Sequence, residues 1–177
     1  VVPRSMICID ISTNQGRDTV GSLVWFEAGR PRKAEYRKFK IKGEAQQDDY
    51  AAIHEVLTRY LTRRQEEQLP LPDLIVIDGG KGQLSAAAAA AAELGAGHIP
   101  MISLAKREEE IFFPGRPDSL RLSRRAPSLR LLQRIRDETH RFGVAYNRKR
   151  RTQRTITSAL LDIPGVGPTR RRVLLER

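Results

Sequence analysis

Two aspartates interrupt or end apolar stretches and are the first candidates for catalysis. Asp10 lies inside the otherwise apolar stretch Met6–Ile11, and Asp78 directly follows the stretch Leu74–Ile77. Burying a carboxylate is costly unless a cation or hydrogen bonds compensate it. Either aspartate alone is compatible with an ordinary turn, because polar residues follow the first and two glycines follow the second. On adjacent strands, the pair instead predicts a site for a divalent cation.

Oxygen ligands of this kind favour Mg²⁺ or Mn²⁺, which can activate water and stabilise a phosphoryl transition state. A third carboxylate could reach the same edge from the start of the following helix, where Asp48 and Asp49 are adjacent. Each of these two residues is also a plausible N-cap, and that role is the simpler one for either residue alone. Spacing does not choose between them.

Hydrophobic periodicity predicts an α/β fold that brings the two aspartates together. A three-strand antiparallel meander comes first, and later strands alternate with helices, so right-handed crossovers should give a mixed sheet with helices on both faces. The first and fourth strands can then be parallel neighbours, with Asp10 and Asp78 at their carboxyl ends. The expected strands are Met6–Ile11, Thr19–Phe26, Glu35–Lys42, Leu74–Ile77 and Ile99–Leu104, with a short hairpin from Ile111–Phe113 and Leu120–Leu122. The expected helices are Tyr50–Leu61, Gln83–Leu94 and Ser128–Arg150.

The charge balance favours a polyanionic partner. The 177 residues include 32 Lys and Arg against 21 Asp and Glu, a net charge of +11. Residues 141–177 contribute much of this excess, with ten basic residues and two acidic ones, although a basic segment can also be a solvated tail. The sequence offers no apolar stretch of about 18 residues for a membrane span, no secretory signal and a single cysteine, Cys8. We therefore expect a cytoplasmic location and no membrane partner.

A glycine hairpin near the C-terminus strengthens the case for nucleic acid. Residues Ile163–Pro168 read IPGVGP, a helix-hairpin-helix signature in which Gly165 and Gly167 let backbone amides approach a phosphate. Arg170 and Arg171 add positive charge to the following helix. A simple Pro-Gly turn is the alternative, and the adjacent arginines favour the hairpin.

The chain is expected to divide into two domains, 1–155 and 156–177, with the basic stretch Arg148–Arg154 as the linker. In the first domain the glycine-rich residues 79–82 match neither a Walker loop nor a dinucleotide fingerprint. They still leave the N-terminus of a helix open to an anionic group, with Lys81 beside it.

Five motifs, in order along the chain, resemble the C-terminal half of the UvrC family, one of the proteins of the bacterial UvrABC excinuclease. The resemblance covers about residues 7–172. It implies a ribonuclease-H-like endonuclease domain followed by the start of a helix-hairpin-helix domain, and a metal-dependent cut in DNA on the 5′ side of a lesion during nucleotide excision repair. The motifs are Ile9–Ser12, Asp48–Ala52, Ile77–Leu84, Leu104–Arg107 and Arg134–Phe142.

The resemblance also assigns roles to individual residues. It implies a catalytic set of Asp10, Asp49, Asp78 and His140, with the three aspartates holding a divalent Mg or Mn ion. The reasoning from strands and topology identifies only Asp10 and Asp78. The choice of Asp49 over Asp48 and the importance of His140, as metal ligand, proton carrier or phosphate contact, come from the resemblance. We also expect four basic residues within these motifs to contact DNA, namely Lys81, Lys106, Arg107 and Arg136.

The expected partners are damaged double-stranded DNA and, through a segment that these 177 residues do not contain, the UvrB protein of the same excinuclease. The family's N-terminal GIY-YIG nuclease, which makes the 3′ cut, and its second hairpin are also missing, so we expect a part of a longer protein. Two alternatives remain: a DNA-binding module without activity, and another ribonuclease-H-like nuclease such as a resolvase. Intact acidic and histidine positions argue against the first.

Overall fold

The computed structural model describes residues 2–14, 18–42, 48–106, 108–161 and 167–175. The chain forms two compact units, Val1–Gly143 and Val144–Arg177. The first unit contains the sheet with its helices. The second contains the end of α3 (Pro127–Leu161) and the short α4 (Pro168–Leu175). The predicted domains 1–155 and 156–177 stay a prediction.

Within the described residues, the first unit is built on a mixed sheet in the order β3-β2-β1-β5-β6-β7, with β4 also paired to β2. The expected meander is confirmed, because β2 pairs antiparallel with both β1 and β4. The expected parallel pairing of the first and fourth major strands is confirmed as β1 beside β5, and β6 continues the parallel part. The strands are β1 (Ser5–Asn14), β2 (Asp18–Glu27), β3 (Arg30–Pro31), β4 (Arg37–Lys40), β5 (Leu74–Asp78), β6 (Met101–Ala105) and β7 (Glu110–Phe112).

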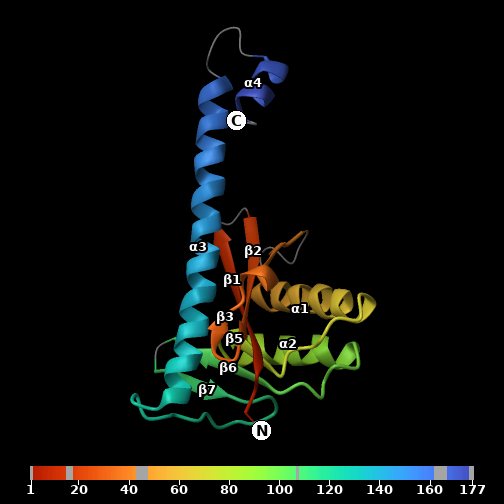
Figure 1. The fold of residues 1–177 in the computed structure, drawn as a ribbon, viewed down its shortest axis with the longest axis vertical. Coiled ribbons are helices and arrows are strands. Elements are labelled where there is room, and N and C mark those ends of the chain that lie inside the picture. The colour runs from red at the N-terminus through yellow and green to blue at the C-terminus, as the bar shows by residue number, and fades with distance from the viewer. Residues whose placement is uncertain (1, 15–17, 43–47, 107, 162–166, 176–177) are drawn as a thin grey trace. The chain divides into compact units, whose positions relative to one another are not determined.

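Helices cover both faces of this sheet (Figure 1). On one face lie α1 (Asp49–Glu66) and α2 (Lys81–Glu93), and on the other lies the first part of α3. Alanine is the best helix former, and its small side chain lets the alanine-rich α2 pack closely against the sheet and α1. Gly21 has a similar effect in β2, since a Cβ there would lie 2.4 Å from a methyl carbon of Val56 in α1.

Two apolar cores result, one on each face. In β1, Ile7 and Ile9 belong to the core under α1 and α2, whereas Met6 and Cys8 belong to the core under α3. Side chains alternate along a strand, so Asp10 shares the face of Met6 and Cys8. By the same alternation, β5 directs Asp78 towards that face, because Val76 packs in the core under α3.

Some local expectations need correction. The predicted linker Arg148–Arg154 is helical and lies within α3. It contains neither glycine nor proline, and lysine, arginine and glutamine are good helix formers. The predicted strand Glu35–Lys42 is shorter, since a 3₁₀ turn occupies Lys33–Glu35 before β4 begins. The predicted hairpin after residue 110 consists of β7 and one isolated bridge, between Ile111 and Leu120.

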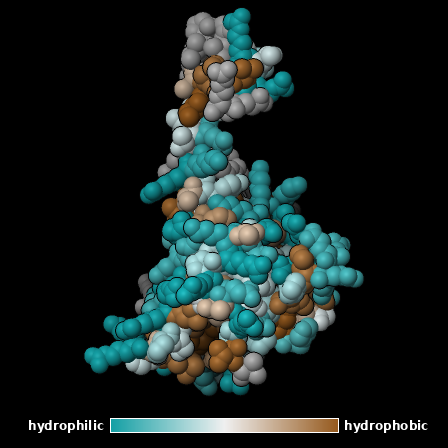
Figure 2. Space-filling model, viewed as in Figure 1, coloured by the Kyte–Doolittle hydropathy of each residue, from teal (hydrophilic) through white to brown (hydrophobic). Residues whose placement is uncertain are grey.

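Hydrophilic side chains cover much of the visible face of the first unit (Figure 2). In the part of the chain that the structure describes, no helix combines the length and apolar character needed to cross a bilayer.

Candidate active site

The parallel register of β1 and β5 brings Asp10 and Asp78 side by side. Ile9 pairs with Ile77, so the next residues along the two strands are the two aspartates. Both are buried, with 5% and 4% of their surface exposed. The expectation that the two carboxylates lie next to each other is therefore confirmed. Only Asp78 ends its strand, however, because β1 continues beyond Asp10 to Asn14.

The two carboxylates have few partners to compensate their burial. Among the described residues, neither side-chain oxygen of Asp78 accepts a hydrogen bond. Burial, and then the charge of Asp10, raise the pKa of Asp78 from 3.8 to about 6. Burial also raises the pKa of Asp10, while Lys106 and His140 act in the opposite direction. Buried, unsatisfied carboxylate oxygens are the donor atoms that Mg²⁺ and Mn²⁺ prefer.

His140 reaches this pair from α3. Its Nδ1 lies 3.4 Å from Oδ2 of Asp10, and 59% of its side chain is exposed. A carboxylate next to Nδ1 favours the tautomer in which that nitrogen donates, which leaves Nε2 as an acceptor. The ring can therefore exchange a proton with a group in the open part of the site.

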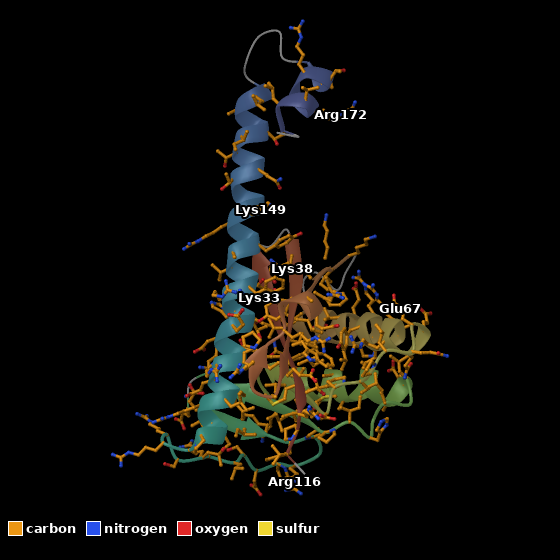
Figure 3. The ribbon with its side chains drawn as sticks, viewed as in Figure 1. Lys33, Lys38, Glu67, Arg116, Lys149 and Arg172 are labelled. Carbon is orange, nitrogen blue, oxygen red and sulfur yellow. The ribbon has the colours of Figure 1, made fainter. Side chains whose placement is uncertain are left out.

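Several contacts fix the helical turn that carries His140. Buried Ile135 and Thr139 pack on the sheet side of α3. The Lys38 ammonium of β4 donates to the Phe142 carbonyl at 3.0 Å and lies over its ring. Lys38 is labelled in Figure 3. Gly143 permits the close approach of the helix to β2, because a Cβ there would lie 3.0 Å from Oγ of Ser22.

Basic residues surround the opening of the site. The Lys106 ammonium lies 3.7 Å from Oδ2 of Asp78. The Arg136 guanidinium pairs with Glu109 at 2.8 Å and also with the neighbouring Asp137. These groups belong to one surface cavity, whose lining is Asp78, Lys106, Arg136, Asp137, His140 and Arg141. The predicted DNA contacts Lys106 and Arg136 thus lie beside the carboxylates.

Asp48 and Asp49 have different positions at the start of α1. Asp48 is the N-cap, and its side chain accepts hydrogen bonds from the backbone N–H groups of Tyr50 and Ala51. Asp49 is exposed and lines a second cavity with Gly80 and Lys81. Its charge contributes to the raised pKa of Asp10, which indicates that the two carboxylates are close enough to interact. Even so, no three His, Cys, Asp or Glu side chains of the described residues converge as a ready metal cluster.

The remaining predicted DNA contacts are Lys81, Arg107, Gly165, Gly167, Arg170 and Arg171. Lys81 donates to the Pro117 carbonyl, and its ammonium lies 5.1 Å from the centre of the Phe112 ring. Arg107 and Gly165 lie outside the described residues. Gly167 is exposed just before α4, which contains Arg170 and Arg171. Their role in DNA binding stays a prediction.

Sequence reasoning missed two residues of the first cavity, Asp137 and Arg141. They are four residues apart on α3, the spacing that places side chains on one face of a helix. The same spacing relates Arg136 to His140, so helical periodicity around the histidine contained the signal. The contact between Lys106 and Asp78 had no comparable signal, because it depends on how β6 ends beside β5.

Comparison with known proteins agrees with this architecture. Residues 1–144 match the model of the UvrC RNase H endonuclease domain. The chain is 63% identical over 175 residues to UvrABC system protein C of Gemmatimonas aurantiaca and 51% identical over 174 residues to that of Prosthecochloris aestuarii. These alignments cover 99% and 98% of the chain but only 28% of each relative.

Among solved structures, human ENDOV aligns with a TM-score of 0.46 at 13% identity, over 59% of this chain and 46% of that one. The family match includes both buried aspartates, the start of α1 and the histidine on α3. The chain therefore belongs to the UvrC RNase H endonuclease domain family, and its mixed sheet with flanking helices is the ribonuclease-H-like fold of that family.

Proposed function

We propose that this chain is a divalent-metal-dependent endodeoxyribonuclease domain that makes the 5′ incision beside a lesion in bacterial nucleotide excision repair. The observation that carries the proposal is the buried pair Asp10–Asp78, in which Asp78 has no hydrogen-bond donor among the described residues and Asp10 lies next to His140. Such a pair weakens the fold unless a cation joins it. The relatives are named as proteins of the UvrABC system, which supports UvrB as a partner. Damaged duplex DNA as the substrate and a cytoplasmic location are part of the same proposal.

The donor set fits Mg²⁺ or Mn²⁺. Asp10 and Asp78 would hold the ion, and Asp49 would complete its ligands by a movement of its exposed side chain towards Asp10. A bound divalent ion would lower the pKa of its bound water and stabilise the negative charge that develops on the phosphate. Both oxygens of Asp78 remain available for this role among the described residues.

The chain's own groups then position the DNA and move protons. His140 keeps Nδ1 towards Asp10, which leaves Nε2 as the nitrogen that would accept or return a proton during hydrolysis, and the residue lines the cavity. Arg136 lines the same cavity and is oriented by Glu109, so its charge faces the path of an anionic backbone. Further along the chain, Gly165, Gly167, Arg170 and Arg171 are proposed to contact backbone phosphates as a partial helix-hairpin-helix.

Nicking of supercoiled plasmid in the presence of Mn²⁺ tests this function. We expect the parent chain to nick, Asp10→Ala and Asp78→Ala to lose nicking, and Asp118→Ala to retain it. Asp118 is an exposed aspartate outside the cavity lined by Asp78 and His140, so its variant controls for the loss of one negative charge. Equal nicking by the parent and Asp78→Ala would contradict the assignment, and DNA binding without any nicking would indicate a non-catalytic module.

The position of the cut needs a second assay. The aspartate equivalent to Asp78 can be replaced in UvrABC system protein C of Gemmatimonas aurantiaca. A labelled DNA duplex with one lesion can then be incubated with the complete UvrABC system. We expect loss of the 5′ cut with retention of the 3′ cut. Loss of both cuts, or of the 3′ cut alone, would contradict the proposed place of this domain in the reaction.

A further inference from the structure

We propose that the Lys106 ammonium is a built-in counter-ion of the Asp10–Asp78 pair, and that it competes with the divalent cation and leaves the carboxylates when the cation binds. The inference rests on the proposed function, which assigns a cation to this pair. It gives Lys106 a role before DNA arrives, distinct from a contact with the DNA backbone.

The contact between Lys106 and Asp78 is electrostatic and easily exchanged. Its N···O distance of 3.7 Å exceeds the 2.7–3.2 Å of an N–H···O hydrogen bond. The Asp78 side chain is fully buried, whereas 63% of the Lys106 side chain is exposed. The ammonium therefore lies between a buried carboxylate and solvent, on a flexible stem that can turn outwards without disturbing the core.

Other cations near the site are held by partners of their own. Arg136 pairs with Glu109 and Asp137, and Arg141 pairs with Glu138. Lys106 differs from both arginines, because its ion pair within the described chain is with Asp78 alone. Its charge also opposes the rise in pKa of both aspartates, so it acts on the pair and not on Asp78 only.

A divalent cation between the two carboxylates would lie within a few ångströms of the ammonium. Like charges at that separation repel each other. Charge interactions over such distances typically shift the pKa of an ionisable group by about one to three units. The ammonium and the metal ion are therefore alternative occupants. Once displaced, the ammonium is at the mouth of the cavity, where it can meet a phosphate, so metal binding and DNA binding would strengthen each other.

Calorimetric titration with Mn²⁺ alone, without DNA, tests the competition. We expect Lys106→Met to bind Mn²⁺ about tenfold more tightly than the parent, the equivalent of one pKa unit of charge interaction. Lys106→Arg should bind like the parent, because it keeps the charge. Lys42→Met removes the same charge from an exposed position after β4 and should also leave the affinity unchanged.

The titration should be done at about pH 8. Loss of the ammonium raises the tendency of Asp78 to hold a proton, and this pH lies well above the pKa of about 6. Thermal unfolding gives a second readout: Mn²⁺ should raise the melting temperature of Lys106→Met by more than that of the parent at one concentration.

The outcomes separate the inference from the proposed function. One outcome would overturn the proposed competition but leave the proposed metal site intact. In that outcome the parent binds Mn²⁺, Asp78→Asn does not, and Lys106→Met binds Mn²⁺ no more tightly than the parent. Absence of Mn²⁺ binding by the parent and by Lys106→Met would overturn the competition and the proposed metal-dependent function together. Tight binding by Lys106→Met with weak binding by the parent would support both.

Discussion

Replacing Asp78 with asparagine should stabilise the metal-free protein at neutral pH. Burial and the Asp10 charge raise the pKa of Asp78 from 3.8 to about 6 in the folded chain. Each pKa unit corresponds to 1.36 kcal/mol, so the ionised carboxylate lowers the free energy of unfolding by about 3 kcal/mol. Asparagine has nearly the same shape and no charge, and it also relieves the repulsion from Asp10.

The pH dependence has a definite sign. Between pH 3.8 and about 6 the folded protein retains a proton that the unfolded chain releases, so stability contributed by this group falls as pH rises through that window. The advantage of Asp78→Asn over the parent should therefore grow by about 2 kcal/mol between about pH 4.5 and about pH 7.5. Urea unfolding of both proteins at several pH values, without divalent ions, measures the difference.

Two controls make this comparison specific. Asp118→Asn makes the same substitution at an exposed aspartate outside the cavity, and it controls for the substitution itself. Addition of Mn²⁺ at neutral pH should stabilise the parent more than Asp78→Asn, because only the parent keeps both carboxylates. A difference between Asp78→Asn and the parent that stays constant across the pH range would refute the account of a buried, destabilised carboxylate.

Three further predictions concern the other parts of the site and the fold. His140→Asn and His140→Ala should slow single-turnover nicking by about 10²- to 10⁴-fold, with little change in the urea midpoint because most of the ring is exposed; parental rates in both would make the histidine structural. Asp48→Ala should lose about 1 kcal/mol of stability as a removed N-cap and still nick, whereas Asp49→Ala should fold normally and nick poorly; equal nicking by both would remove the distinction. Gly21→Ala should cost about 1–3 kcal/mol in urea unfolding, since its Cβ would overlap Val56; unchanged stability would mean that α1 is not packed tightly on β2.

The sequence was sufficient for the part of the site that depends on strands. Asp10 and Asp78 could be predicted as neighbours because one interrupts and the other ends an apolar strand, and because a crossover makes those strands parallel. The structure adds that both side chains face the α3 side, since they share the alternation of Cys8 and Val76. The alternation of side chains along a strand and the topology of the chain are enough to predict that these two aspartates are neighbours.

The part of the site that depends on α3 could not be predicted in the same way. Periodicity identifies a long helix, but it does not say which turn passes beside β1. That position depends on contacts between distant segments, such as Tyr36 with Glu138 at 2.9 Å and Lys38 with the Phe142 carbonyl. The resemblance to a family supplied His140, and the structure supplies the reason for its position. Basic composition likewise does not reveal that Arg148–Arg154 continues α3, whereas the helix propensity of its residues is consistent with it.

The energetic cost of burying Asp10 and Asp78 argues for catalysis over simple DNA binding. A module that only attached to DNA would need positive charge on its surface, and exposed lysines and arginines supply that at little cost to the fold. Asp10 and Asp78 do the opposite, because they place two negative charges in a buried position beside the surface that would face DNA. His140 contacts Asp10, and Lys106 contacts Asp78. A buried acidic pair is useful near a phosphate when a cation joins the two, and phosphodiester hydrolysis is the chemistry that such a cation serves.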